Sequence, residues 1–157
     1  MLKSDVHSHS TPLHLGFSCY ILNTMGQALL TRRALNKATW PGVWTNSSCG
    51  RPGPGEGLVA AVHRRVAQES GPSVTSIRSV LSQFCYRAVD TTGIVENEIC
   101  PVFLAQADGP LDPVQAEVSQ WKWGGINEVR TTITATPFLV SLWIVDQPDA
   151  GVFEMLQ

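Results

Sequence analysis

A single cysteine in a turn-like run is the first candidate for chemistry. The run from Trp40 to Gly50 reads Trp-Pro-Gly-Val-Trp-Thr-Asn-Ser-Ser-Cys-Gly, so two tryptophans flank a Pro-Gly turn and Cys49 lies between small residues. Glu56 and an amphipathic stretch that ends at Glu69 follow. A thiol on such a turn is expected to face a cavity, so the pattern predicts a reactive thiol beside an acidic helix. Three further cysteines lie in strand-like apolar runs, where thiols are commonly buried: Cys19, Cys85 and Cys100.

Two glutamates and two histidines form a second candidate site. Glu96 and Glu98 alternate in Ile-Val-Glu-Asn-Glu-Ile, so on a β-strand both side chains leave the same face. Neighbouring carboxylates repel each other unless a proton or a cation lies between them. With His7 and His14 upstream, these residue types suit a divalent transition metal. The alternative is that the two histidines are solvated residues of a polar N-terminal segment.

A third pattern resembles the Nudix box of diphosphate hydrolases. Gly50, Glu56 and Glu69 keep the spacing of that box, in which the helix carries several carboxylates that collect magnesium ions on a diphosphate. Here Arg65 and Gln68 stand at positions that would be glutamates. The remaining carboxylate can hold a single Mg²⁺, but not a metal cluster that activates water for hydrolysis. The pattern favours diphosphate binding without cleavage, and its alternative is an ordinary amphipathic surface helix.

Longer motifs resemble type I isopentenyl diphosphate isomerase. They are Trp-Pro-Gly-Val-Trp-Thr-Asn-Ser with Cys-Gly, the altered Nudix helix, Tyr86-Arg-Ala, and Gly-Ile-Val-Glu-Asn-Glu with Cys-Pro-Val-Phe. The resemblance extends from about Lys3 to Trp143. It implies an α+β Nudix fold, a mixed β-sheet sandwiched between helices in one domain over residues 1–157. It also implies an enzyme that moves a carbon–carbon double bond, converting isopentenyl diphosphate into dimethylallyl diphosphate.

The resemblance further implies roles for individual residues. Cys49 is implied as one acid–base group, and Glu98, assisted by Tyr86, as the group that works on the opposite face of the alkene. The ring of Trp143 is implied to face a cationic centre. The implied diphosphate contacts are Lys3, Arg33, Lys37 and Arg65. Glu69 is implied as a Mg²⁺ ligand that acts together with the substrate diphosphate. The implied ligands of a second metal, Mn²⁺ or Zn²⁺, are His7, His14, Glu96 and Glu98.

Two departures from the family pattern leave functions other than an isomerase open. Arg51 stands where the family has a histidine metal ligand. Because a guanidinium stays protonated and cannot ligate a metal, the second metal is expected to bind weakly. The chain also starts close to Lys3, so an N-terminal strand of the family is expected to be absent. The alternatives to an isomerase are a non-catalytic prenyl-diphosphate binder and a Nudix-type diphosphate hydrolase.

Composition limits the class of partner. The chain has 157 residues, of which 43% are hydrophobic and 15% charged, and a net charge of −2. These values fit one folded domain and give no basic footprint for nucleic acid. The longest apolar run, Phe138 to Val145, is too short to span a bilayer, and no secretory signal is visible. Widely spaced cysteines without a metal motif fit a reducing cytoplasm, and a small-molecule prenyl diphosphate is the expected partner.

These side chains need elements that bring them together. Apolar runs bounded by turn residues predict strands at 15–23, 27–32, about 80–89, 94–105 and 118–123. Val59, Val62 and Val66 at helical spacing predict a helix that ends at Glu69-Ser-Gly-Pro. Two more helices are expected near 124–130 and 137–146. Hairpins mixed with separated helices predict a mixed sheet between helices.

Overall fold

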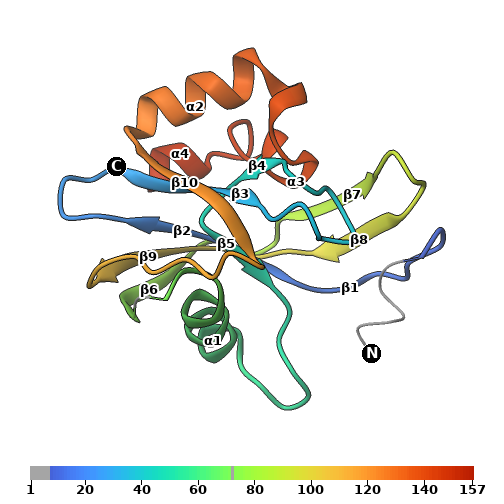
Figure 1. Cartoon of the computed structure of the whole chain (residues 1–157), viewed down its shortest axis with the longest axis horizontal. Helices are drawn as coiled ribbons and strands as arrows, with labels where there is room; N and C mark the ends of the chain where they lie inside the picture. The colour runs from blue at the N-terminus through green and yellow to red at the C-terminus, as the bar shows by residue number, and fades with distance from the viewer. Residues whose placement is uncertain (1–7, 72) are drawn as a thin grey trace.

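Short strands and a few helices make up the computed structural model, which describes residues 8–71 and 73–157 (Figure 1). The strands are β1 (His14–Leu15), β2 (Phe17–Leu22), β3 (Ala28–Arg33), β4 (Trp44–Thr45), β5 (Ser48–Gly50), β6 (Ser73–Leu81), β7 (Cys85–Val89), β8 (Val95–Ile99), β9 (Val102–Asp108) and β10 (Val118–Gly124). The helices are α1 (Leu58–Ser70), α2 (Ile126–Ala135), the 3₁₀ helix η2 (Pro137–Leu139), α3 (Leu142–Val145) and α4 (Val152–Met155).

Two sheets organise these strands. The larger has the order β10-β3-β2-β9-β6, with β4 beside β3 and β5 beside β2. It is mixed, because β2 and β9 run parallel whereas the other pairs are antiparallel. The smaller sheet has the order β1-β8-β7, in which His14 lies opposite Glu98 and Glu98 lies opposite Tyr86. Directly opposite residues share a face of a sheet, so this register brings three predicted site residues into one row.

Helices cover both faces of the larger sheet (Figure 1), because β2 alternates its side chains between two apolar clusters. Phe17, Cys19 and Ile21 pack with residues of α1, whereas Tyr20 and Leu22 pack with residues of α2, α3 and α4. All six residues of β2 are buried, which is typical of a central strand whose two faces are both covered. The predicted α+β fold, with a mixed sheet between helices, is confirmed.

Two of the predicted strands differ from the structure. The strand predicted at about 80–89 corresponds to β7 and only the last residues of β6, and the rest of β6 was missed because most of its side chains are exposed and only Val74 and Val80 are buried. The strand predicted over 94–105 divides at Cys100-Pro101 into β8 and β9, which belong to different sheets. Proline lacks the N–H that a strand ladder requires, so the chain leaves one sheet there and enters the other.

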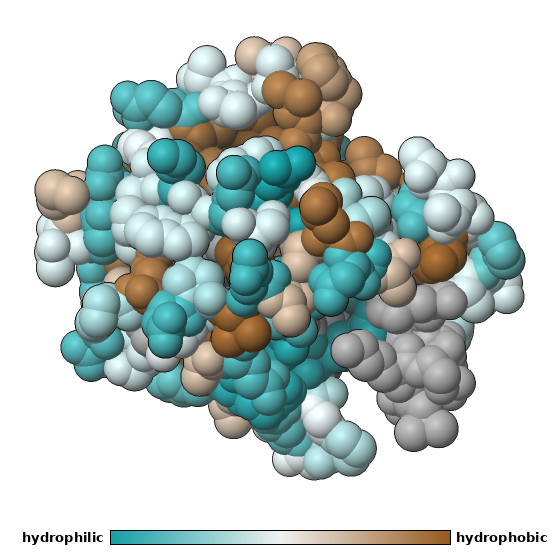
Figure 2. Space-filling view, viewed as in Figure 1, coloured by the Kyte–Doolittle hydropathy of each residue, from teal (hydrophilic) through white to brown (hydrophobic). Residues whose placement is uncertain are grey.

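The C-terminal part is helical, but in shorter pieces than predicted. The helix expected near 124–130 is confirmed as α2. The helix expected over 137–146 divides into η2 and α3, because Val140 between them is extended and bridges to Trp44. Phe138 is 81% exposed, and apolar atoms reach the surface at the top of the view in Figure 2. No helix in the described part of the chain has the length and apolar character needed to cross a bilayer.

Candidate active site

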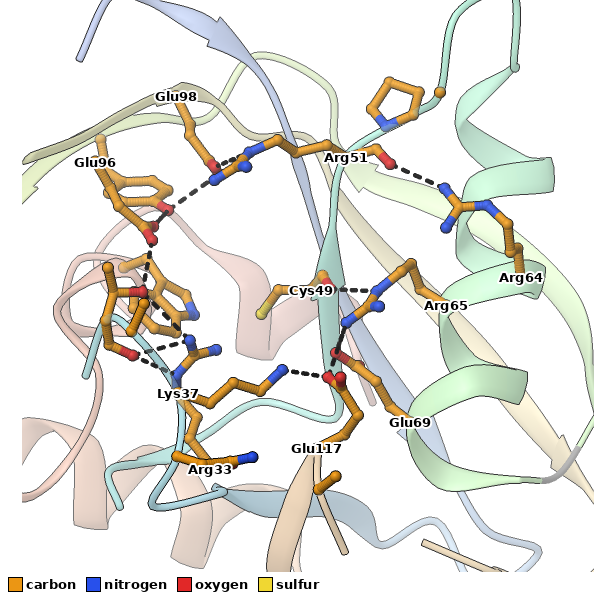
Figure 3. Close-up of a pocket in the computed structure, with 18 of the residues that line it drawn as sticks. Arg33, Lys37, Cys49, Arg51, Arg64, Arg65, Glu69, Glu96, Glu98 and Glu117 are labelled. Atoms are coloured by element: carbon orange, nitrogen blue, oxygen red, sulfur yellow. Dashed lines mark hydrogen bonds and ion pairs between the residues drawn. The ribbon is translucent and has the colours of Figure 1, made fainter. Parts of the chain in front are cut away.

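One cavity of about 650 Å³ gathers most of the predicted site residues (Figure 3). Its walls come from the loop after β3, from β5 and the loop that follows it, from α1, and from the smaller sheet. Lys3 and His7 lie outside the described residues. The predicted residues that line the cavity are Arg33, Lys37, Cys49, Arg65, Glu69, Tyr86, Glu96, Glu98 and Trp143.

Cys49 lies in the middle of β5, which pairs with β2. Its half-buried thiol donates a hydrogen bond to Asn46 Oδ1 at 3.1 Å. Burial raises the pKa of Cys49 to about 12, and the carboxylate of Glu69 acts in the same direction. A thiolate is the nucleophilic form of cysteine, so at neutral pH this residue is a neutral thiol and not the reactive one that the turn predicted.

The four cysteines differ in exposure, partly against expectation. Cys19 and Cys100 are buried, as their apolar runs predict. Cys85 is exposed, because it is the first residue of β7 and its side chain faces away from the core. The exposed thiol of Cys85 is therefore not among the groups that line the cavity.

Asn46 connects the thiol to the indole, and sequence reasoning did not single it out. Its Oδ1 accepts hydrogen bonds from Cys49 Sγ, from Trp143 Nε1 at 3.2 Å and from Thr45 Oγ1 at 2.8 Å. Its Nδ2 donates to the carbonyls of Cys19 and Ser48, at 3.1 and 2.9 Å. The side chain is fully buried. Loss of any of these hydrogen bonds would leave a buried polar group unsatisfied, so Asn46 fixes the position of Cys49 relative to Trp143.

Glu96 and Glu98 lie side by side on β8, as their alternation predicts. The Tyr86 hydroxyl lies 2.8 Å from Glu96 Oε2 and 3.0 Å from Glu98 Oε2, and its one hydrogen is donated to one of them at a time. Burial raises the pKa of Glu96, and the neighbouring Glu98 adds to the effect. Burial and the same two carboxylates raise the pKa of Tyr86. Tyr86 therefore stays protonated and bridges the two carboxylates.

Two glycines let charged side chains pass close to the backbone. A Cβ on Gly16 would lie 2.3 Å from Glu98 Oε2, and a Cβ on Gly50 would lie 2.7 Å from Arg65 Cγ. Both distances are far below van der Waals contact. Any other residue at either position would push a cavity-lining side chain aside.

Of the ligands predicted for the second metal, namely His7, His14, Glu96 and Glu98, the structure describes the last three, and Arg51 contacts two of them. Arg51 Nε lies 3.0 Å from His14 Nε2 and 3.4 Å from Glu98 Oε1, and these two atoms lie 3.1 Å apart. The guanidinium is a cation that cannot ligate a metal, and it covers the atoms that would do so. Within residues 8–71 and 73–157, no three His, Cys, Asp or Glu side chains are placed to hold a metal ion. With Arg51 in contact with both of them, His14 and Glu98 do not fit a transition metal.

Basic side chains and Glu69 form an ion-pair network along the wall near α1 (Figure 3). Arg65 pairs with Glu69 and also, at 3.3 Å, with Glu117, which pairs in turn with Lys37. Ser48 donates a hydrogen bond to Glu69 Oε2 at 2.6 Å. Burial raises the pKa of Glu69, although Arg65 opposes it. Glu117 belongs to no motif and gave no sequence signal, yet it holds two predicted diphosphate contacts next to each other.

Arg33 and Trp143 form a stacked pair. The Arg33 guanidinium lies over the indole, with Cζ 5.3 Å from the ring centroid, and donates to the Thr39 carbonyl at 2.9 Å. The ring of Trp40 packs edge-on against Trp143 at 5.4 Å, and that of Tyr86 lies tilted at 6.3 Å. One face of the indole therefore already has a positive charge over it, as the electron-rich face of a tryptophan ring favours.

The fold and the charged cavity beside α1 define a Nudix domain, and the Nudix family model matches residues 12–143. A Kocuria rhizophila protein named isopentenyl-diphosphate Delta-isomerase is 48% identical over 93% of this chain and 81% of its own length. A Paenarthrobacter aurescens protein of the same name is 51% identical over 90% and 77%. DR0079 from Deinococcus radiodurans shares the fold, with a TM-score of 0.71 at 16% identity over 96% of this chain and 89% of its own. The chain belongs to the isopentenyl-diphosphate Delta-isomerase family.

Proposed function

We propose that this chain converts isopentenyl diphosphate into dimethylallyl diphosphate, working as one Nudix domain. The observation that carries the proposal is that Cys49 and the Tyr86–Glu98 pair line one cavity together with Trp143. A double-bond shift requires two proton-transfer groups and an electron-rich surface for a cationic centre, and these residues supply both. Family membership supports the same reaction.

The reaction adds one proton to the terminal alkene carbon and removes one from C2, without oxidation or reduction. Protonation of the alkene creates a tertiary cationic centre, so both transfers must occur where water is excluded. We assign them to the neutral thiol of Cys49 and to Glu98, which the Tyr86 hydroxyl holds by a hydrogen bond. The Trp143 ring would stabilise the developing charge without offering a nucleophile that traps it.

The diphosphate end is assigned to the basic wall of the cavity. Arg65 and Lys37 are held next to each other by Glu117, and an arginine fork suits phosphate oxygens. Mg²⁺ is commonly bound by one or two carboxylates together with substrate phosphates, so the single carboxylate of Glu69 fits a Mg²⁺ whose other ligands come from the diphosphate. Bound there, the ion would neutralise phosphate charge. Further contacts are assigned, as the family resemblance implies, to Lys3 and Arg33.

Hydrolysis of the diphosphate is not favoured by the residues of α1. Arg65 and Glu69 line the cavity, and Gln68 accepts a hydrogen bond from Arg65 at 3.3 Å. One carboxylate does not assemble the metal cluster that activates water. We also propose a cytoplasmic location, because all four cysteines are free thiols, as is usual in a reducing compartment.

Incubation with isopentenyl diphosphate and Mg²⁺ tests the proposal. Dimethylallyl diphosphate is the expected product, whereas phosphate release would indicate a hydrolase and no turnover would indicate a binder. Cys49→Ala and Glu98→Gln should each lower kcat by roughly 10² to 10⁴-fold, the usual contribution of a general acid–base group. Cys85→Ala is the matched control and should keep its activity, because Cys85 is exposed and lies outside the cavity. Turnover by Cys49→Ala at the wild-type rate would contradict the assignment.

A further inference from the structure

We propose that Arg51 takes the place of a metal ion beside Glu98, as a positioning residue whose fixed positive charge holds the His14–Glu98 pair. Among the residues that the structure describes, the donors beside Glu98 do not match a transition-metal site. This role of Arg51 goes beyond the proposed function, and it rests on that function only in taking Glu98 as a proton-transfer group. Arg51 itself is not assigned a proton-transfer step.

The geometry places the guanidinium where a metal would have to bind. Arg51 Nε is 3.0 Å from His14 Nε2 and 3.4 Å from Glu98 Oε1. A metal held by those two atoms would lie about 2 Å from each, so it would have to displace the guanidinium. The Arg51 side chain is 24% exposed, whereas that of Glu98 is 8% exposed. The positive charge thus reaches a buried carboxylate, where screening by water and salt is weak.

The hydrogen bonds of the His14 ring also make Arg51 and a metal ion alternatives at this position. His14 Nδ1 lies 3.0 Å from the Pro12 carbonyl, which can only accept, so Nδ1 carries the hydrogen. Nε2 lies 3.0 Å from Arg51 Nε and 3.1 Å from Glu98 Oε1, so it accepts a hydrogen bond from Arg51 in the neutral ring and donates one to Glu98 in the protonated ring. A metal ion would need the same lone pair of Nε2. Arg51 and a metal are therefore alternatives at this atom, and the chain supplies Arg51.

Both oxygens of Glu98 have defined neighbours as a result. Oε1 faces Arg51 and His14, and Oε2 accepts from the Tyr86 hydroxyl at 3.0 Å. Oε2 also lies so close to the backbone at Gly16 that no Cβ would fit between them. The carboxylate is thus oriented from all of these sides without a metal ligand bond.

The backbone of Arg51 is anchored by residues of the Nudix box frame. Arg64 Nη2 donates to the Arg51 carbonyl at 3.0 Å. Glu56 holds Arg64 through two hydrogen bonds, at 2.8 and 2.7 Å, and accepts a third from the Gly53 N–H at 2.7 Å (Figure 3 shows the bond from Arg64 to Arg51). Glu56 and Arg64, which are not assigned as metal ligands, therefore fix the loop that carries Arg51.

Metal uptake tests the inference independently of catalysis. The wild-type chain, Arg51→His and Arg87→His are stripped with a chelator, dialysed against Co²⁺, and examined by visible absorption and elemental analysis. The wild-type chain should take up no stoichiometric Co²⁺, whereas Arg51→His should take up about one equivalent. Arg87→His is the matched control. Arg87 is exposed on β7, so this substitution adds a histidine away from the cavity. Tight uptake by the wild-type chain, or none by Arg51→His, would overturn the inference.

Catalysis supplies the second measurement, with Mg²⁺ present throughout. The transition-metal chelator 1,10-phenanthroline should leave wild-type turnover unchanged. Arg51→Ala should lower kcat by about 10- to 100-fold, as removing a group that orients a site residue usually does, and added guanidinium ion should restore part of the loss. A merely structural role would give no such rescue, so its absence refutes the positioning role. If no variant isomerises while the Co²⁺ results hold, the proposed function fails and the charge replacement stands.

Discussion

Iodoacetamide at pH 8 is expected to label Cys85 well before Cys49. Because burial raises the pKa of Cys49 to about 12, roughly one molecule in 10⁴ carries a thiolate there. An ordinary exposed thiol with a pKa of about 8.5 is about one-quarter thiolate at the same pH. The ratio exceeds 10³, but the more basic thiolate is also the better nucleophile. With a Brønsted coefficient of about 0.4–0.5, Cys49 should react roughly 50- to 100-fold more slowly than the exposed thiol.

Timed quenching, followed by peptide mapping and an isomerase assay on each aliquot, measures both rates and their link to activity. Loss of turnover should follow the slow labelling of Cys49, and the labelling rate should rise about tenfold per pH unit between pH 7 and 10, since the thiolate fraction does so. The Cys85→Ala variant should lose activity at the wild-type rate. Labelling of Cys49 as fast as free glutathione would refute the neutral thiol, and inactivation that follows Cys85 would refute its role.

Two further predictions concern glycine and an ion pair. Gly16→Ala should displace the Glu98 carboxylate, because the new Cβ would meet Glu98 Oε2 at 2.3 Å. It should therefore lower kcat by about 10- to 100-fold, as the loss of a group that positions a site residue usually does. Gly57→Ala is the control and should keep wild-type turnover, because its Cβ meets nothing within 4 Å. Hydrogen bonds from Arg64, then from the backbone, lower the pKa of Glu56 to about 2. A carboxyl with a lowered folded-state pKa stabilises the fold above its unfolded pKa of about 4.3, and this contribution disappears as the pH falls toward 2. The Tm difference between the wild-type chain and Glu56→Gln should therefore be constant from pH 6 to 7 and shrink below pH 4, and a difference that grew on acidification would contradict the pairing.

Local patterns were sufficient for part of the fold and the site. The alternation of Glu96 and Glu98 places both carboxylates on one face of any strand they form, because the side-chain period of a strand is two. The valines at helical spacing predicted the helix α1, and Val62 and Val66 are buried on its inner face with Ala61, whereas Val59 is 48% exposed. The run around Cys49 likewise identified a residue that lines the cavity. Each of these properties depends on residues that are close together in the sequence.

Only the tertiary structure decided how distant groups meet. Strand register and the anchoring of a loop bring Arg51 beside His14 and Glu98. Packing between a strand and a C-terminal helix lets Asn46 join Cys49 to Trp143. The neutral state of the Cys49 thiol was hidden for the same reason. Its pKa reflects loss of solvent and the charge of Glu69, which lies on another element, and a Ser-Ser-Cys-Gly run carries no information about either. The sequence thus determined which chemical groups are available and on which local faces they lie, and long-range packing determined their neighbours, their solvation and hence their protonation.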